Sequence, residues 1–377
     1  MKKIAYWGPF IDNVATVKAI LNSSISINKY SKKYKSIILN ASGEWDLYKN
    51  IKNSTYYDLR SENYINKLPK FSFVKSRYSY ILIILKSFFP LKNYIEKEKP
   101  DFLIIHLITS LPIILFLLFN FNTKLCLRIS GLPKLNIFRK FLWKLCNKKL
   151  HKVYCPTLAT LNKLKSLSIF DDHKLNYLPD PIISSSEIIK LKNEKNLDTQ
   201  FSEDNLILVG RLTKQKNFEL FVDAFVTISK KYPKIKANIF GDGELKNDLI
   251  NKIKEQGLEK KIKLLGYKKN IFKYFHKSKF FVLTSLWEDP GFVIPEAAFS
   301  NLSIISSNCP NGPEEILEYG KGGYIFKNNS KESLISCLED ALNEKEKKIY
   351  EKKLMCKKSI RRFTLFYHFK LLEKILD

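Results

Sequence analysis

Short apolar runs of four to six residues alternate along this chain with longer segments in which apolar side chains recur every three or four positions. The short runs predict buried β-strands, and the periodic segments predict helices that cover a sheet. In the first half the predicted strands are Ile4–Trp7, Ser36–Leu39, Phe102–Ile105, Lys124–Ile129, Val153–Cys155 and Leu175–Leu178. This alternation indicates an α/β fold with doubly wound parallel sheets, whose ligands bind beyond the carboxyl ends of the strands.

A second series of the same kind follows a break at Leu178-Pro-Asp-Pro181 and a polar stretch. Its predicted elements are Leu206–Val209, Phe218–Tyr232, Ala237–Phe240, Glu244–Gln256, Ile262–Leu265, Ile271–Lys277, Phe280–Thr284, Pro295–Ser300 and Ser303–Ser306. Because 377 residues exceed what one core usually fills, we expect two Rossmann-like domains, residues 1–183 and 205–359, joined by a linker at 184–204. The last helix, Phe363–Leu376, is apolar on one face, and we expect residues 360–377 to pack back on the first domain.

One apolar segment, Leu103 to Phe121, carries no formal charge and is long enough to resemble a membrane span. His106 and Pro112 interrupt it, so we favour a buried strand, a turn, and a helix that starts at Pro112, since proline suits the first helical position. Met1-Lys-Lys leads directly into a strand without the long apolar stretch of a secretory signal.

The formal net charge is +28, and more than half of it lies before residue 181. Such asymmetry indicates an anionic partner for the first half: nucleic acid, anionic lipid or a phosphorylated substrate. Part of the lysine excess reflects a general compositional bias. The six cysteines are scattered without metal-ligand spacing, which favours a reduced cytosolic compartment over a disulfide framework.

A basic amphipathic helix is predicted from Phe138 to Leu150. Its apolar face is expected to hold Phe138, Phe141, Leu142, Leu145 and Cys146, and its other face Arg139, Lys140, Lys144 and Lys148 with Trp143 among them. Tryptophan beside cations suits an anionic membrane surface. The alternative is that the apolar face packs on the domain core while the cations are solvated.

Gly210-Arg211 closes a predicted strand. Lys216 lies five residues after Arg211, just before the next predicted helix. Glycine lets the backbone approach a ligand, and a guanidinium can bind a diphosphate through two parallel hydrogen bonds. The N-terminus of the following helix directs further positive charge at the same space. The alternative is that both cations belong to a solvated loop.

Glu288 and Glu296 lie eight residues apart, and the prolines between them preclude one continuous helix. Glu288 therefore belongs to the loop after Phe280–Thr284, and Glu296 to the first turn of the next helix, where its charge is favoured. Gly291 offers a backbone N–H where a side chain would obstruct a ligand. The alternative is that Glu296 only caps its helix.

Gly241-Asp-Gly243 ends another strand, but Lys246 stands where a dinucleotide fingerprint needs a third glycine, which disfavours a nicotinamide cofactor. It marks either a turn beside a nucleotide or merely a turn. His106 ends the strand Phe102–Ile105 at the predicted ligand edge, although a lone histidine there is more often a core residue. Together the cations and carboxylates predict a site for a sugar joined to a diphosphate. Because the chain has no D-x-D triplet at this site, with Asp171-Asp172-His173 its nearest look-alike, we expect no metal and no cofactor.

These motifs together resemble the retaining glycosyltransferases of family 4, which have the GT-B fold of two Rossmann-like domains facing across a cleft. The family's G-R-x-x-x-x-K matches Gly210-Arg211…Lys216, and its E-x7-E matches Glu288…Glu296. The resemblance implies that Arg211 and Lys216 stabilise the diphosphate, that Glu288 contacts the sugar, and that Glu296 contacts the ribose. It further implies donor contacts and catalytic positions at a small set of residues: Gly8, His106, Gly210, Gly241, Gly291 and Phe292. Arg128 and Gly131 match a stretch of some bacterial members and carry no assigned role.

The resemblance implies a metal-independent enzyme that moves a sugar from a nucleoside diphosphate, with retention, to a glycan or lipid-linked acceptor. The expected process is assembly of bacterial surface polysaccharide, O-antigen, capsule or lipopolysaccharide, at the inner face of the plasma membrane. The donor nucleotide, the sugar, the acceptor and the linkage stay open. Two alternatives compete: a sugar-nucleotide 2-epimerase of the same fold, and a nucleic-acid binder, for which the paired glutamates have no purpose.

Overall fold

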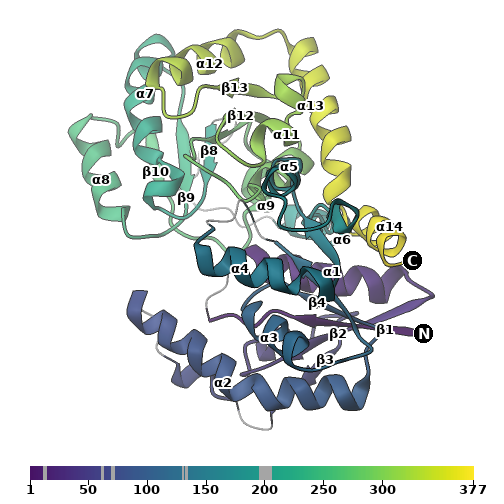
Figure 1. The fold of residues 1–377 in the computed structure, drawn as a ribbon. Coiled ribbons are helices and arrows are strands. Elements are labelled where there is room, and N and C mark those ends of the chain that lie inside the picture. Colours follow the sequence, from purple (N-terminus) through teal and green to yellow (C-terminus); the bar gives the residue numbers. More distant parts are fainter. Residues whose placement is uncertain (12–14, 61–62, 69–72, 130, 132–134, 195–205) are drawn as a thin grey trace. The chain divides into compact units, whose positions relative to one another are not determined.

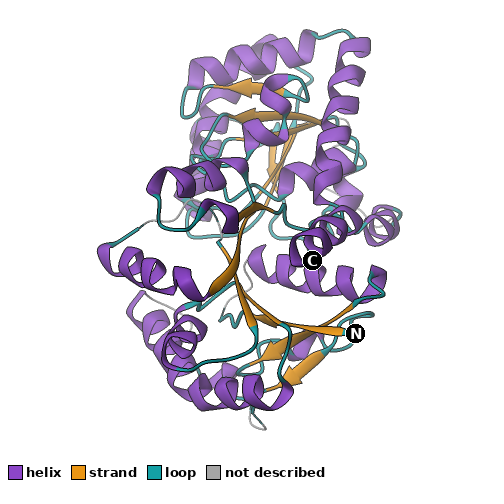
Figure 2. Ribbon diagram, turned by 45° about the vertical axis from the view of Figure 1, so that its right-hand side comes forward, coloured by secondary structure: helices purple, strands orange, loops and turns teal. Residues whose placement is uncertain are grey.

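The computed structural model describes residues 1–377 except 12–14, 61–62, 69–72, 130, 132–134 and 195–205. The chain forms two compact units (Figure 1). Unit 1 comprises Met1–Ile182 and Leu365–Asp377, and unit 2 comprises Ile183–Thr364. Each unit has its own sheet with helices on both faces, which Figure 2 shows with strands in orange and helices in purple.

Among the described residues, unit 1 contains a seven-stranded parallel sheet of order β3-β2-β1-β4-β5-β6-β7. Its strands are β1 (Lys2–Trp7), β2 (Tyr34–Asn40), β3 (Tyr56–Asp58), β4 (Phe102–Ile105), β5 (Lys124–Arg128), β6 (Leu150–Cys155) and β7 (Leu175–Tyr177). After β3 the chain returns to the middle of the sheet and adds β4 on the other side of β1. Beyond the carboxyl ends of β1 and β4 lies the topological switch point, where α/β sheets bind ligands.

Two layers of helices bury the faces of this sheet. One face is covered by α1 (Ala15–Tyr30) and α14 (Leu365–Leu376), which contact each other. The other face is covered by α2 (Phe73–Glu98), α3 (Ser110–Leu118), α4 (Ile137–Cys146) and α5 (Leu158–Leu167). The last helix of the described chain therefore completes a core that the first strand begins.

A buried chain of hydrogen bonds joins α14 to this core. Tyr6 Oη lies 2.8 Å from Ser23 Oγ, which lies 2.7 Å from His368 Nε2, and His368 Nδ1 lies 2.8 Å from the carbonyl oxygen of Pro179. Because a carbonyl can only accept, Nδ1 carries the proton and donates it, so Nε2 accepts from Ser23 and Ser23 accepts from Tyr6. Burial lowers the pKa of His368 to about 4, which agrees with a neutral ring.

Among the described residues, unit 2 contains a six-stranded parallel sheet of order β10-β9-β8-β11-β12-β13. Its strands are β8 (Leu206–Val209), β9 (Ala237–Phe240), β10 (Ile262–Leu264), β11 (Phe280–Leu283), β12 (Ser303–Ser307) and β13 (Tyr324–Phe326). This is the Rossmann strand order, and its switch point lies between β8 and β11.

The helices of unit 2 are α6 (Ser185–Lys192), α7 (Phe218–Lys231), α8 (Lys246–Glu255), α9 (Phe272–Phe275), α10 (Val293–Phe299), α11 (Pro313–Ile316), α12 (Lys331–Asn343) and α13 (Glu346–Ile360). The core is formed where α7 and α12 pack together beside the sheet. The helix α6 occupies the first part of the stretch that we expected to be a linker. It packs on α9, and Asn270 Nδ2 donates to the carbonyl of Leu191 at 2.8 Å. The rest of that stretch lies outside the described residues.

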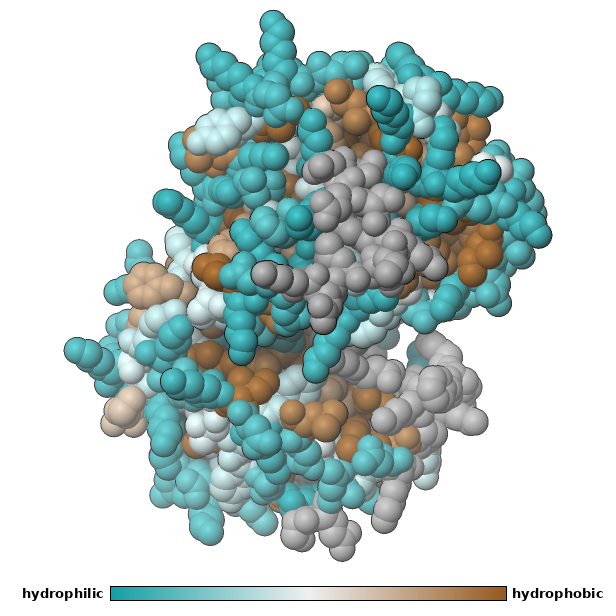
Figure 3. All heavy atoms as spheres, turned by 180° about the vertical axis from the view of Figure 1, so that it is seen from behind, coloured by the Kyte–Doolittle hydropathy of each residue, from teal (hydrophilic) through white to brown (hydrophobic). Residues whose placement is uncertain are grey.

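The strands predicted from apolar runs are confirmed, with ends that agree to within three residues. The segment Leu103 to Phe121 forms β4, a turn and α3, but α3 begins at Ser110, so Pro112 is its third residue and not its first. No helix in the described part of the chain is both long enough and apolar enough to cross a bilayer. Figure 3 shows apolar side chains at the surface interspersed with a larger number of hydrophilic ones.

The helix α4 is rotated relative to the expected arrangement. Trp143, expected among the cations, is only 6% exposed and packs 5.5 Å from the ring of Phe170. Phe141 and Leu145, expected on the packed face, are 61% and 49% exposed. The apolar arc of this helix is wider than the face it can bury, and the largest side chain in that arc takes the buried place. Of the predicted apolar face, Cys146 is buried, and the Phe138 side chain lies outside what the structure describes.

Candidate active site

The predicted cations and carboxylates of unit 2 gather at its switch point. Gly210, Arg211 and Lys216 follow β8, and Glu288 follows β11, the neighbouring strand. Arg211 is exposed to solvent, whereas Lys216 ends a short 3-10 helix at Lys214–Lys216 and is largely buried. The loops after two adjacent strands thus bring together residues that are 72 positions apart.

Lys216 and Glu288 form a direct ion pair. Lys216 Nζ lies 2.5 Å from Glu288 Oε1, and the two side chains are only 14% and 6% exposed. The hydroxyl of Ser285 donates to the same carboxylate oxygen at 2.5 Å. A buried charge is tolerated only with such partners, so each group fixes the position of the other.

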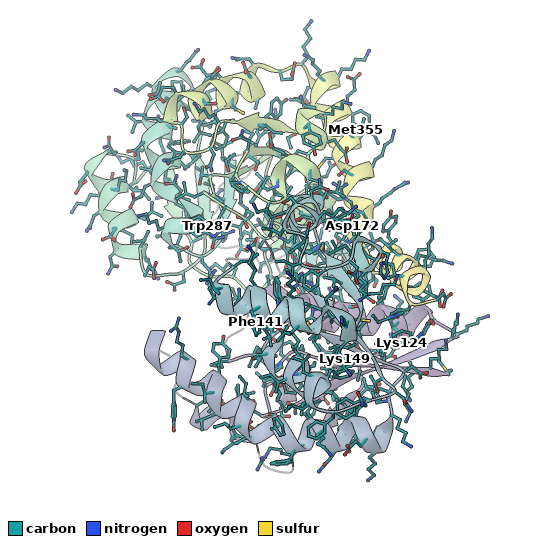
Figure 4. The ribbon with its side chains drawn as sticks, viewed as in Figure 1. Lys124, Phe141, Lys149, Asp172, Trp287 and Met355 are labelled. Atoms are coloured by element: carbon teal, nitrogen blue, oxygen red, sulfur yellow. The ribbon has the colours of Figure 1, made fainter. Side chains whose placement is uncertain are left out.

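Hydrogen bonds between the two loops hold this pair in place. The hydroxyl of Thr284 donates to the carbonyl of Lys216 at 2.9 Å, and the N–H of Leu286 donates to the carbonyl of Gln215 at 2.8 Å. Gln215 Nε2 donates in return to the carbonyl of Trp287 at 2.9 Å. The Trp287 side chain, labelled in Figure 4, is 46% exposed. The site is therefore a rigid junction of two loops with an aromatic ring at its edge.

Glycines allow the backbones at this junction to approach closely. Gly241, after β9, has φ of +150°, and a Cβ on it would lie 1.8 Å from the carbonyl oxygen of Gly210. A Cβ on Gly210 would in turn lie 3.3 Å from the aliphatic part of Lys216. Only glycine at position 241 therefore permits the ends of β8 and β9 to meet, and glycine at position 210 leaves room for the aliphatic stem of Lys216.

The loop from β11 to α10 carries the remaining donor-contact predictions. Gly291 has φ of +91°, in the left-handed region, and a Cβ there would lie 3.3 Å from Glu288 Cγ. Phe292 directly precedes α10, and Glu296 lies in the first turn of that helix, half-buried. Both carboxylates of the E-x7-E motif thus belong to one loop-helix segment, as expected.

In unit 1 the predicted residues Gly8 and His106 follow β1 and β4, the pair of strands at that switch point. The N–H of His106 donates to the carbonyl of Trp7 at 2.9 Å. A Cβ on Gly8 would lie 2.3 Å from Cδ1 of Ile20 and 3.6 Å from Cβ of His106, so the glycine keeps these chain segments close. Burial, and then the nearby charge of Arg128, hold the pKa of His106 well below its usual value, so the ring is neutral at pH 7.

Sequence reasoning missed a buried ion pair in unit 1. Arg128, at the end of β5, donates two hydrogen bonds to Asp180, Nε to Oδ1 at 2.9 Å and a terminal nitrogen to Oδ2. Both side chains are less than 5% exposed. The pair ties β5 to the segment that follows β7. The aspartate between two prolines at 179 and 181 was the available signal, because prolines fix the backbone that aims its carboxylate.

All six cysteines are buried and unpaired with one another. Among the described residues there is no group of three or more His, Cys, Asp or Glu side chains arranged to hold a metal ion.

Comparison with known proteins gives consistent matches. The family called glycosyl transferases group 1 matches residues 190–362. An uncharacterized glycosyltransferase of Methanocaldococcus jannaschii is 32% identical over 70% of this chain and 73% of its own length. A Campylobacter jejuni protein named N-acetylgalactosamine-N,N'-diacetylbacillosaminyl-diphospho-undecaprenol 4-alpha-N-acetylgalactosaminyltransferase is 27% identical over 63% of this chain, and the match spans 65% of its own length.

A solved structure of a glycosyltransferase from Rickettsia africae is similar over the whole chain. It has a TM-score of 0.74 at 16% identity and covers 100% of this chain and 97% of its own. The two Rossmann-like sheets are therefore those of the GT-B fold. The sequence matches and the fold agree, and the chain belongs to the glycosyl transferases group 1 family, the nucleotide-sugar-dependent glycosyltransferases of family 4.

Proposed function

We propose that this enzyme moves a sugar, with retention of configuration, from a nucleoside diphosphate to a hydroxyl of a glycan or lipid-linked acceptor. The acceptor would belong to the assembly of a bacterial surface polysaccharide, O-antigen, capsule or lipopolysaccharide. The observation that carries the proposal is that the buried Lys216–Glu288 pair and the exposed Arg211 all come from loops at the switch point of unit 2. This arrangement offers positive charge for a diphosphate and a fixed carboxylate for sugar hydroxyls within one junction.

In this mechanism the cations make the largest contribution to transition-state stabilisation. Arg211 would bind the diphosphate through two parallel hydrogen bonds, and Lys216 would add a positive charge whose position Glu288 fixes. Positive groups placed where negative charge develops usually supply the largest catalytic contribution. Glu288 would accept hydrogen bonds from hydroxyls of the donor sugar, and Glu296 from the ribose.

Retention needs no protein nucleophile if the acceptor hydroxyl attacks from the side of the leaving group. The bond from the acceptor oxygen to the anomeric carbon then forms as the bond to the diphosphate breaks. The proton of the acceptor hydroxyl passes to the departing phosphate oxygen. The neutral ring of His106 would serve as a hydrogen-bond partner for the transferred sugar, since it can donate from one nitrogen and accept at the other.

The proposal is tested by transfer itself. A thermal-shift screen of nucleotide sugars identifies the donor, and release of its sugar is then measured with and without a saccharide acceptor, in EDTA. We expect release only with an acceptor, an unchanged anomeric configuration by NMR, and full activity in EDTA, because Arg211 and Lys216 supply the charge. Sugar modification without an acceptor would indicate the epimerase instead, and activity restored by Mn²⁺ or Mg²⁺ would contradict metal independence.

The same enzyme is proposed to dock on an anionic membrane through unit 1. Exposed apolar side chains line α4 at intervals of four residues: Ile137, Phe141 and Leu145 are 89%, 61% and 49% exposed. Phe141 is labelled in Figure 4. Lys140 and Lys144 are exposed on the same helix.

On α2, a second exposed apolar row comprises Tyr78, Ile81, Leu85 and Phe89, and residues 73–95 contain no acidic side chain. Apolar rows flanked only by cations suit an anionic bilayer, to which each cation near the surface adds about 1 kcal/mol of binding free energy.

Reversing two charges on α4 should release the protein from such a membrane. We expect Lys140→Glu/Lys144→Glu to abolish most co-sedimentation with phosphatidylglycerol vesicles, because attraction becomes repulsion at the docking face. The matched control is Lys347→Glu/Lys358→Glu on α13, which changes the net charge equally at exposed positions of unit 2. Equal sedimentation of both variants would show that the α4 cations are merely solvated.

A further inference from the structure

A cavity of about 410 Å³ opens within unit 1, where β4 and β5 end and α3 and α4 begin. Its polar lining is His106, Thr109, Ser110, Arg128, Asn136 and Arg139, and apolar side chains including Trp143 complete it. The volume lies within the roughly 300–1,000 Å³ typical of ligand pockets. Of the residues that line this cavity, only His106 has a role in the proposed transfer reaction.

The lining of this cavity favours negative charge. Two arginines and two hydroxyls contribute to it, and no carboxylate does among the described residues that line it. Two helices of nine and ten residues, α3 and α4, start at its wall. The cap of α4 is satisfied, since Asn136 Oδ1 accepts from the N–H of Arg139 at 2.8 Å. At α3 the cap residue Thr109 makes no side-chain capping bond, and Pro112 has no N–H, so Ser110 and Leu111 supply the N–H groups that the start of that helix can offer to an anion.

A buried side chain of the lining is a second observation that indicates a ligand site. His106 is only 8% exposed, and neither of its ring nitrogens has a hydrogen-bond partner in the protein. Buried polar groups without partners are uncommon in folded proteins because each one costs free energy. A bound group that lies in the cavity and carries oxygen atoms would accept from one nitrogen of this ring.

We infer that this cavity binds a phosphate group of the acceptor substrate. Arg139 and the N-terminus of α3 would hold the phosphate oxygens, with the hydroxyls of Thr109 and Ser110 as further donors. Arg128 is already bonded to Asp180 and acts as a positioning residue that fixes the floor of the cavity. The cavity would thus select an acceptor that bears a phosphate or diphosphate next to the sugar chain. This inference rests on the proposed function for the identity of the bound substrate, but the anion site itself does not.

Binding of inorganic pyrophosphate to the whole 377-residue chain, measured by isothermal titration calorimetry, tests the anion site. We expect Arg139→Gln to raise the dissociation constant of one class of sites by at least tenfold. Lys140→Gln is the matched control, because it removes the same charge from the neighbouring residue, which does not line the cavity. Arg211→Gln should leave this class of sites unchanged, which separates it from the site of unit 2. Wild-type binding by Arg139→Gln would overturn the inference.

A pair of synthetic saccharide acceptors, identical except that one carries a diphosphate and the other a neutral hydroxyl, tests the assignment to the acceptor. Arg139→Gln should raise the KM of the diphosphate acceptor about tenfold, leave the neutral acceptor unaffected, and recover in Arg139→Lys. An equal loss on both acceptors would indicate a structural role and overturn the assignment. So would anion binding seen only with phosphatidylglycerol vesicles, which would assign the cavity to a lipid headgroup. A third outcome separates the two proposals. If the enzyme transfers no sugar but still binds pyrophosphate in a way that depends on Arg139, only the proposed function is contradicted.

Discussion

Replacing Arg211 with alanine is expected to lower kcat/KM by two orders of magnitude or more while the protein stays folded. The guanidinium is exposed at the switch point of unit 2, so its removal leaves no buried group without a partner. What is lost is a charge aimed at the departing diphosphate, and one such group contributes about 3–4 kcal/mol, which corresponds to 10²–10³ in rate. Steady-state kinetics with the identified donor, together with thermal unfolding, measure both parts of the expectation.

The control for this variant is Lys214→Ala. Lys214 is also exposed, lies three residues from Arg211 and carries the same charge, but it begins the 3-10 helix that ends at Lys216. We expect it to keep its activity within a few-fold of the wild type. Near-normal turnover of Arg211→Ala, or an equal loss in both variants, would refute a specific role for the guanidinium.

Removal of Lys216 should affect stability as well as activity. Lys216→Met leaves the carboxylate of Glu288 buried with only the hydroxyl of Ser285 as a described partner of that oxygen. Breaking one side of a buried pair typically lowers the free energy of unfolding by about 3–5 kcal/mol. Urea unfolding should therefore show a clearly lower midpoint for this variant, and transfer activity should be lost.

A second substitution separates the two effects. Lys216→Met/Glu288→Gln removes both charges, and the amide can still accept from Ser285, so we expect much of the stability to return while transfer stays abolished. The control is Lys252→Met, whose ion pair with Asp223 is partly exposed at 25% and 34% and should contribute no more than about 1 kcal/mol. If Lys216→Met were as stable as the wild type, or if the double variant recovered turnover, the role of this pair would be contradicted.

The sequence predicted most strands because parallel strands covered on both faces read as continuous apolar runs. It missed the three-residue strands β3 and β13, although it predicted β7 and β10, which are equally short. The rotation of α4 could not be read from periodicity, because its apolar residues occupy a wider arc than the core can cover. Trp143 is buried and Phe141 is exposed, and tertiary packing, which periodicity does not report, determines which of the two side chains faces the core.

The site was predictable as far as its residue types. Gly210, Arg211, Lys216 and Glu288 were each placed after the right strand, and the structure brings them to one switch point. Their direct ion pair was not predicted, since contact across 72 residues depends on β8 lying beside β11. The Arg128–Asp180 pair and the cavity at α3 and α4 depend likewise on strand order, which local patterns do not encode.

The bond between His368 and Ser23 has a consequence for synthesis. The ribosome makes the strands of unit 1 first, yet α14 follows all of unit 2 in the chain. Until that helix emerges, the face of the sheet beside α1 stays uncovered, and the hydroxyl of Ser23 lacks its imidazole. Unit 1 can therefore complete its core only after unit 2 and α14 have been synthesised. Nascent chains arrested before residue 365 should present an apolar surface to chaperones.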